Sequence, residues 1–226
     1  MVRSNPAKLT LEASYWKDLL ATRGPQLMME DGTATYRERF QRWFGLDIAT
    51  HHFGDLLELG PGPFGSVECT NWRSAVAVDP LMDDYLRMPF PRREGVRRMK
   101  GFAEHLPFPD ASFDSLVAFN VIDHVQEVEK ALQEIARVLR PAGAAYIYVH
   151  VYRLPLAIVL NIVPWIDHFH DIHMTPRTLR RLLGHAGLRP AGERFSHERL
   201  PSTHPVKARL AHRFVILGYY ARLSRS

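Results

Sequence analysis

The sequence has almost no cysteine, and this scarcity excludes several classes of protein. Its 226 residues contain one cysteine, Cys69, which rules out a disulfide framework and a cysteine-rich metal site. The start of the chain, MVRSNPAKLTLEAS, lacks the apolar core of a signal peptide. We therefore expect a cytoplasmic protein.

Long hydrophobic runs are also missing. The most apolar stretch, LPLAIVLNIVPWI from Leu154 to Ile166, contains Pro155 and Pro164 and is shorter than the roughly 20 residues that a bilayer requires. We expect no membrane span. The stretch is interpreted as a buried or lid segment, within a substrate-side insertion near 153–173, that faces a bulky apolar ligand.

Positive charge is in slight excess but is scattered. The formal net charge is +5, and the only local run is PRREGVRRMK at 91–100. Such a run is usually a solvated face, and aromatic residues are not interleaved with it as they are in strand-binding platforms. We expect no nucleic-acid partner.

The periodicity of apolar residues changes after the first fifty residues. Before that point it is helical, with Leu11, Tyr15 and Leu19 near one face of a first helix, and it predicts an N-terminal helical cap over 1–52. A second helix carries four aromatic residues: Tyr36, Phe40, Trp43 and Phe44. The remaining chain, 53–226, is predicted to form the core.

Short apolar runs alternate with helical patterns in the predicted core. Strands are expected at DLLELG, SAVAVD, GVRRMKG, SFDSLVAFN, AAYIYVHVY and HRFVILGYYARL. Helices are expected at VQEVEKALQEIARVLRPAG, with Leu139 in its apolar repeat, and at TPRTLRRLLGHAGL, with Thr175 as N-cap and Pro176 at the first helical position. This alternation predicts an α/β fold with a parallel sheet covered on both faces.

A glycine-rich loop follows the first expected strand. Gly60, Gly62 and Gly65 have the spacing G-x-G-x-x-G, and Asp79 ends the second strand about twenty residues later. A carboxylate there can accept both hydroxyls of an adenosine ribose, although it could also serve as a helix N-cap. The pattern suits NAD as well as S-adenosylmethionine.

Three features disfavour a dinucleotide. The carboxylate of Glu58 would repel a pyrophosphate but could help to hold an ammonium group, and Pro61 and Pro63 lack the backbone donors of a phosphate cradle. The segment GFAEHLPFPDASFDSLVAFNVIDHV has no place in a nicotinamide-binding fold.

Four segments in order resemble the class I S-adenosylmethionine-dependent methyltransferases, in the ubiquinone-biosynthesis-like, type 11 branch. They are LELGPGP, AVAVDP, AEHLPFPDASFDSLVAFNVIDHV and EKALQEIARVLRPAGAAYI, and the resemblance covers roughly Asp55 to Tyr152. It implies a doubly wound, Rossmann-like, seven-stranded, mostly parallel sheet with an antiparallel last strand. It also implies S-adenosyl-L-methionine as cofactor and methylation of a small, hydrophobic or aromatic metabolite of secondary metabolism on oxygen, nitrogen or carbon.

The resemblance also implies a set of cofactor-binding residues. Its first motif would line the methionine end, Asp79 would bind the ribose, and Pro80 or Leu81 would pack on the adenine. The full set is Glu58, Gly60, Pro61, Gly62, Asp79, Pro80, Ala103, Glu104 and Asn120. The chain departs from the family pattern at Phe102, where an aspartate is common, at Gly65, which falls one residue late, and at Ala142, which replaces a common glycine.

Histidines on the expected pocket side are candidates for a general base, which is needed only if the acceptor must lose a proton. We select His124 and His173 as catalytic candidates, and His150 is less favoured. A metal site from His168, His170, Asp171 and His173 lacks a fixed ligand spacing, so we expect no metal. Tyr15 and Trp16 could form an aromatic lid over the cofactor, but ordinary core packing is the favoured interpretation.

Other functions remain open at this level. A cofactor-binding protein without transferase activity would carry the same adenosine site. An RNA methyltransferase and an NAD-dependent oxidoreductase are weaker alternatives. The expected partner is a small-molecule acceptor, with a homodimer as one option for assembly.

Overall fold

A single mixed sheet organises the chain in the computed structural model, which describes residues 6–152, 173–196 and 216–225. The seven strands lie in the order β3-β2-β1-β4-β5-β7-β6, and β7 runs antiparallel to the other six. The predicted Rossmann-like sheet is therefore confirmed. The strands are β1 Asp55–Leu59, β2 Ser74–Asp79, β3 Val96–Lys100, β4 Phe113–Phe119, β5 Leu139–Tyr152, β6 Leu188–Ser196 and β7 Ile216–Arg225.

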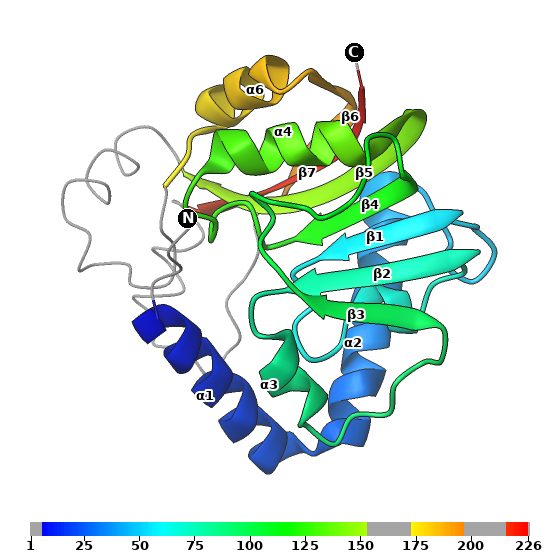
Figure 1. The fold of residues 1–226 in the computed structure, drawn as a ribbon, viewed down its shortest axis with the longest axis vertical. Coiled ribbons are helices and arrows are strands. Elements are labelled where there is room, and N and C mark those ends of the chain that lie inside the picture. The colour runs from blue at the N-terminus through cyan, green and yellow to red at the C-terminus, as the bar shows by residue number, and fades with distance from the viewer. Residues whose placement is uncertain (1–5, 153–172, 197–215, 226) are drawn as a thin grey trace.

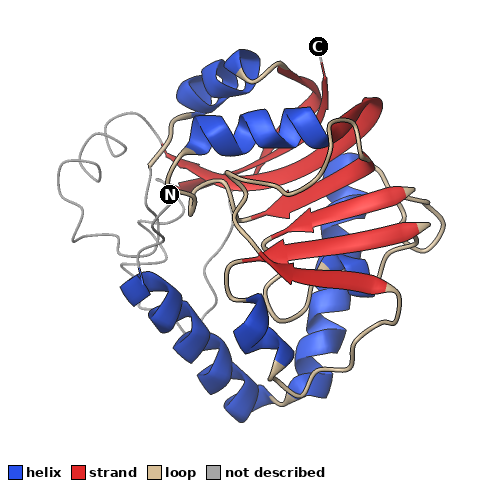
Figure 2. Ribbon diagram, in the orientation of Figure 1, coloured by secondary structure: helices blue, strands red, loops and turns tan. Residues whose placement is uncertain are grey.

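Helices cover both faces of the sheet (Figures 1 and 2). The helices α4 (Val128–Val138) and α6 (Pro176–His185) lie on one face, and α2 (Pro25–Arg39) lies on the other. Alternate residues of a strand point to opposite faces. On β5, Ile147 accordingly joins the core under α4 and α6, whereas Tyr146 and Tyr148 join the core on the α2 side.

Helix α4 ends earlier than its apolar spacing predicts. Val128, Leu132 and Ile135 form its buried face, but Leu139 already belongs to β5 and pairs with Phe113 of β4. The prediction that placed Leu139 in the helix was wrong, because pairing with β4 takes this residue into the sheet. The register then shifts, since Ser115 pairs with Ala144.

The second predicted helix of the core forms as expected. The Thr175 hydroxyl accepts a hydrogen bond from the Thr178 amide at 3.1 Å, and Pro176 is the first residue of α6. Strand β6 follows it directly and was not predicted from its sequence, LRPAGERFS. Its register shifts between Pro190 and Gly192, and it lies at the edge of the sheet, where such residues are tolerated.

The N-terminal region consists of α1 (Pro6–Arg23), α2 and the π-helix η1 (Phe40–Phe44). Pro25 begins α2, and Gly45 ends η1 in a left-handed conformation with φ 69°. The four aromatic residues noted in the sequence pack against the core on this face of the sheet, with Phe40 buried and the other three partly buried: Tyr36, Phe40, Trp43 and Phe44.

The apolar face predicted for α1 is correct at Leu19, which packs against the small core next to this helix, but wrong at the other two residues. Leu11 and Tyr15 are 51% and 57% exposed. The helix instead packs Ala13 and Trp16 into a separate small core with Leu81, next to α3 (Met82–Leu86). Helix α1 lies on the side toward which the ends of β1 and β2 point (Figure 1). Among the described residues, no helix is long and apolar enough to cross a membrane.

Phe40 packs among several aromatic rings on the α2 side of the sheet. Its ring is fully buried and lies 5.2 Å from the ring of Phe53 and 5.4 Å from that of Phe119. We predict that Phe40→Ala lowers the free energy of unfolding by about 3–5 kcal/mol, because it removes a large side chain from a packed core. Urea denaturation measures this. The control Leu27→Ala, at a side chain that is 54% exposed, should change stability by less than about 0.5 kcal/mol. An equal loss in both variants would contradict the prediction.

Candidate functional site

The buried carboxylate of Glu58 holds the glycine-rich loop through hydrogen bonds to its backbone. Its carboxylate accepts hydrogen bonds from the backbone amides of Ser66 at 2.7 Å and Val67 at 2.9 Å, and only 2% of the residue is exposed. A Cβ atom at Gly65 would lie 2.5 Å from Glu58 Oε2, so only glycine fits there. The third glycine of the motif is thus needed for close packing over Glu58. The predicted contact of Glu58 with a cofactor stays a prediction.

The first two glycines make the tight turn after β1. Gly60 and Gly62 both have left-handed backbones, with φ of 61° and 62°, which glycine adopts without strain. The Gly60 amide donates to the Val78 carbonyl at 2.9 Å and so ties the turn to β2. A Cβ atom at Gly62 would face the Trp16 ring at 3.7 Å. The turn therefore presents bare backbone toward α1, as a loop that cradles a ligand requires.

Asp79 connects this turn to the loop after β2. Its carboxylate accepts from the amides of Leu81 at 2.8 Å and Gly62 at 3.2 Å, and the residue is 4% exposed. The alternative interpretation as a helix N-cap does not hold, because the N-cap of α3 is Leu81. Asp79 is therefore held at the tip of β2, beside the glycine turn.

Both buried carboxyl groups have raised pKa values. Burial raises the pKa of Glu58 to about 7 against the hydrogen bonds from Val67 and Ser66. Burial also raises the pKa of Asp79 to about 7, and the nearby charges of Glu12 and Glu58 contribute to the increase. Both groups become easier to ionise when a positive charge arrives. The site therefore favours a cationic ligand over a phosphate.

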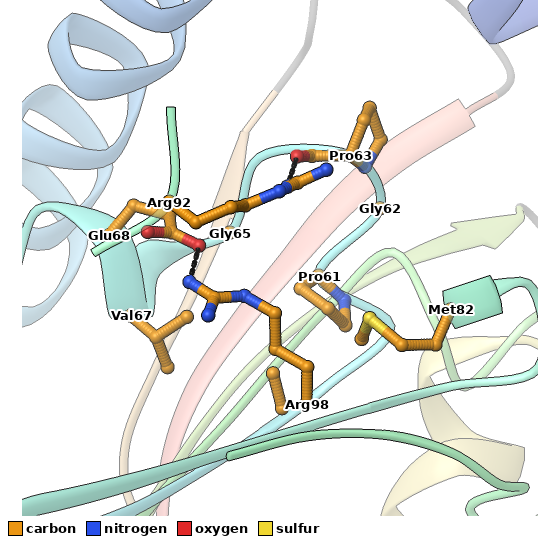
Figure 3. A pocket seen from close by; sticks show the side chains of 10 residues that line it. Pro61, Gly62, Pro63, Gly65, Val67, Glu68, Met82, Arg92 and Arg98 are labelled. Carbon is orange, nitrogen blue, oxygen red and sulfur yellow. Dashed lines mark hydrogen bonds and ion pairs between the residues drawn. The ribbon is translucent and has the colours of Figure 1, made fainter. Parts of the chain in front are cut away.

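The far side of the loop is fixed by arginines from the basic run at 91–100. Arg92 donates to the carbonyls of Pro63 and Tyr85, both at 2.5 Å, and Arg98 forms an ion pair with Glu68 at 2.5 Å (Figure 3). Arg93 donates to the carbonyl of Thr70. The expectation of a purely solvated face was wrong, since these guanidinium groups hold loop carbonyls that the sheet leaves unpaired. Arg92 and Arg98 line a small pocket behind the glycine turn.

Polar side chains also gather where β4 and β5 end. Asn120 has a left-handed backbone with φ 59°, and its side-chain amide nitrogen lies 3.2 Å from His124 Nε2. On β5, His150 Nδ1 lies 3.2 Å from Asp123 Oδ2, and its Nε2 lies 2.7 Å from the Tyr148 hydroxyl. Asn120 and His124, both predicted site residues, are thus brought together. His150 was less favoured in the sequence analysis, and its partner Asp123 lies 27 residues away in the chain.

The other predicted residues occupy different surroundings. Ala103 lies in the core under α4. The Glu104 carboxylate accepts from the Gln126 amide at 2.9 Å, just before α4 begins. His173 is buried against the ring of Tyr152, with 4.8 Å between centroids. Pro61 is buried in the loop, and Pro80 is half-buried after Asp79.

The interpretation of 153–173 as an insertion falls, apart from His173, outside the described residues, as do His168, His170 and Asp171. Within the described part of the chain, no group of three or more His, Cys, Asp or Glu residues could hold a metal ion.

Comparisons with known proteins agree with this geometry. Residues 57–147 match the family Methyltransf_11, described as a methyltransferase domain. This segment belongs to the class I S-adenosylmethionine-dependent methyltransferases of type 11. The methyltransferase domain therefore contains both the glycine loop and Asp79.

The match to curated relatives covers only part of each relative's sequence. The chain is 38% identical over 96 residues to a probable S-adenosylmethionine-dependent methyltransferase of Mycobacterium tuberculosis, which covers 39% of this chain and 33% of that protein. It is 33% identical over 115 residues to a demethylmenaquinone methyltransferase of Thermobifida fusca, covering 47% and 48%. The chain thus spans less than half the length of these curated relatives.

Solved structures share the fold of the methyltransferase domain. The YcgJ protein of Bacillus subtilis superposes with a TM-score of 0.58 at 18% identity, over 76% of this chain and 92% of that one. Geranyl diphosphate C-methyltransferase of Streptomyces coelicolor superposes with a TM-score of 0.61 at 16% identity, over 76% and 72%. At these identities the likeness concerns the fold alone.

The residues present fit the cofactor of this family. Gly60 and Gly62 leave the turn without side chains at these two positions, the carboxylate of Asp79 is fixed beside it, and the pKa values of Glu58 and Asp79 favour a cation. Two neighbouring side chains approach these glycines: a Cβ atom at Gly60 would lie 2.5 Å from Val121, and one at Gly62 would lie 3.7 Å from the ring of Trp16.

We predict that binding of S-adenosylmethionine near pH 7 releases protons. With folded pKa values of about 7, Glu58 and Asp79 are each partly protonated at that pH, and a bound sulfonium charge favours their ionised forms. Calorimetry in two buffers of different ionisation enthalpy measures the release. It should disappear near pH 9, where both groups are already ionised. Equal apparent enthalpies in the two buffers at pH 7 would show that neither carboxyl group responds to the ligand.

The raised pKa values of these two groups also predict how the stability of the ligand-free protein depends on pH. The folded pKa of each group lies above its unfolded value, so the folded state holds more protons between about pH 4 and pH 7. The contribution of Glu58 and Asp79 to stability is therefore greatest below this window and decreases as the pH rises through it.

Proposed function

We propose that this protein transfers a methyl group from S-adenosylmethionine to a small, hydrophobic or aromatic acceptor. One observation carries the proposal: a bare glycine turn and a fixed carboxylate, Asp79, lie side by side at the ends of β1 and β2 within a methyltransferase domain. In open α/β sheets, ligands bind beyond the carboxyl ends of the strands. The partly protonated acids around the turn suit a cationic ligand.

The chain's own residues have separate tasks in this proposal. S-adenosylmethionine supplies a sulfonium methyl group that is open to in-line displacement. The backbone of Gly60 and Gly62 receives the amino-acid tail, and Asp79 accepts hydrogen bonds from the sugar. Pro80 and Leu81 pack against the base, and the backbone at Ala103 and Glu104 meets its edge. Asn120 faces the sulfonium region at the end of β4.

The acceptor is proposed to lie beyond the ends of β4 and β5. Asn120, His124 and the linked side chains of Asp123 and His150 gather there. An imidazole of this group can take up the proton of a methyl acceptor that must lose one. The relative named as a demethylmenaquinone methyltransferase supports an apolar acceptor. His124 and His173 remain the proposed catalytic residues, without a metal ion.

We also propose, from the sequence, a helical cap at 1–52 and a methyltransferase core at 53–226. The further proposals are a cytoplasmic location, a role in secondary metabolism, a homodimer and the absence of a nucleic-acid partner. The competing function is a cofactor-binding protein without transferase activity, because the same turn and carboxylate would serve it equally well.

We predict that Asp79→Asn weakens binding of S-adenosylhomocysteine by at least about tenfold. The substitution keeps the shape of the side chain but removes the charge that strengthens its hydrogen bonds to sugar hydroxyls. Isothermal calorimetry measures the dissociation constant. The control Asp83→Asn removes an exposed carboxylate from α3 and should bind as the wild type does. Unchanged affinity in Asp79→Asn would refute the proposed cofactor site.

The catalytic histidines require an assay of methyl transfer. We predict that His124→Ala and His173→Gln reduce turnover of a hydroquinone or phenol panel by about 10²–10⁴-fold if the acceptor must be deprotonated, while S-adenosylhomocysteine binding stays unchanged. His185→Ala, at an exposed position on α6, is the control. Full activity in both variants would exclude them as bases. Binding without turnover of any acceptor by the wild type would favour the non-catalytic alternative.

A further inference from the structure

Glu12 of helix α1 reaches the part of the site where Asp79 is held. The Tyr85 hydroxyl donates a hydrogen bond to Glu12 Oε1 at 3.0 Å, and Tyr85 is fully buried between α1 and the loop after β2. A buried tyrosine hydroxyl needs a polar partner, and here it orients a carboxylate that comes from a separate helix. The position of Glu12 is therefore set by the core next to Asp79.

The effect of Glu12 on the pKa of Asp79 also indicates that these two carboxylates are close. Burial is the main cause of the raised pKa of Asp79, and among the nearby charges that of Glu12 has a larger effect than that of Glu58. The charges of Asp79 and Glu12 also contribute, after burial, to the raised pKa of Tyr85. Two like charges at one place repel each other, and a ligand that donates hydrogen bonds to both relieves this repulsion.

Trp16 lies on the same face of α1 as Glu12. Residues four apart on a helix are neighbours on its surface. The Trp16 ring packs over the Gly62 turn, and the Glu12 carboxylate meets Tyr85 beside Asp79. One face of α1 therefore covers both the glycine turn and the carboxylate at the tip of β2.

A second carboxylate beside Asp79 would provide acceptors for the hydroxyl groups of a ribose. A ribose with two free hydroxyls offers two donors, and each oxygen of Asp79 already accepts one backbone amide, from Leu81 or from Gly62, which leaves one acceptor position on each oxygen. A carboxylate from α1 adds further charged acceptor positions for the two hydroxyls. Such charge-assisted hydrogen bonds are the strong ones.

We propose that Glu12 is a second sugar-binding carboxylate, carried by α1, which closes over a nucleoside ligand and binds its ribose together with Asp79. Tyr85 is a positioning residue that holds Glu12 in place. This inference rests on the proposed function, because it concerns the same cofactor, and it extends the site to a helix outside the matched domain at 57–147.

The test removes the carboxylate charge from the protein and the hydroxyls from the ligand in turn. The probes are S-adenosylhomocysteine and its synthetic 2′,3′-dideoxy analogue, titrated by calorimetry into the full chain. Glu12→Gln should weaken S-adenosylhomocysteine about tenfold and leave the affinity of the analogue unchanged. Glu12→Gln keeps an oxygen that can accept from Tyr85, so α1 stays docked. The matched control Asp18→Asn, at an exposed carboxylate of the same helix, should change neither affinity.

Tyr85→Phe provides a second variant. It removes only the hydroxyl that orients Glu12, so it should weaken S-adenosylhomocysteine by less than Glu12→Gln does, and again only while the sugar hydroxyls are present. Far-ultraviolet circular dichroism of each variant verifies the fold.

Each outcome has a defined meaning. An unchanged dissociation constant in Glu12→Gln, or an equal loss for both ligands, overturns the inference, because Glu12 would then act at most by docking α1. If Asp79→Asn weakens binding while Glu12→Gln does not, the proposed function stands and this inference fails. If the wild type does not bind S-adenosylhomocysteine, the proposed function and this inference fail together.

Discussion

The hydrogen bonds from the Ser66 and Val67 amides to the buried Glu58 carboxylate are the interaction on which the site depends. They bend the chain back over the end of β1 and leave the Gly60–Gly62 turn as bare backbone. Gly65 is glycine because the chain must pass directly over that carboxylate. Arg92 holds the outer side of the loop through the Pro63 carbonyl. The ligand-facing turn is therefore held in place by Glu58 on its inner side and by Arg92 on its outer side.

Several carboxyl groups lie close together at this end of the sheet. Glu58 and Asp79 are buried with pKa values of about 7, and Glu12 adds a third carboxylate from α1. Such an arrangement costs stability while the groups are ionised and the site holds no positive charge. A cationic nucleoside offsets that cost. Ligand choice, proton release and closure of α1 are in this view consequences of one electrostatic arrangement.

Much of this arrangement could be predicted from local patterns in the sequence. The apolar runs ending in Leu59 and Asp79, and the glycine spacing between them, identified the sheet and the loop because each depends on neighbouring residues. Glu12 could not be found in this way, since its partner Tyr85 is distant in sequence. Leu139 was misassigned because strand pairing overrides helical spacing. The loop contacts of Arg92, Arg93 and Arg98 could not be predicted, because their partners lie on residues that are distant in the sequence.

The central claim is that the turn after β1 and the carboxylate at the tip of β2 together bind one nucleoside. A crystal structure of the protein with S-adenosylhomocysteine tests this most directly. The account predicts that the amino-acid tail lies over the Gly60–Gly62 backbone and that the sugar hydroxyls lie within hydrogen-bond distance of Asp79. A ligand bound elsewhere, or a sugar that points away from Asp79, would contradict it.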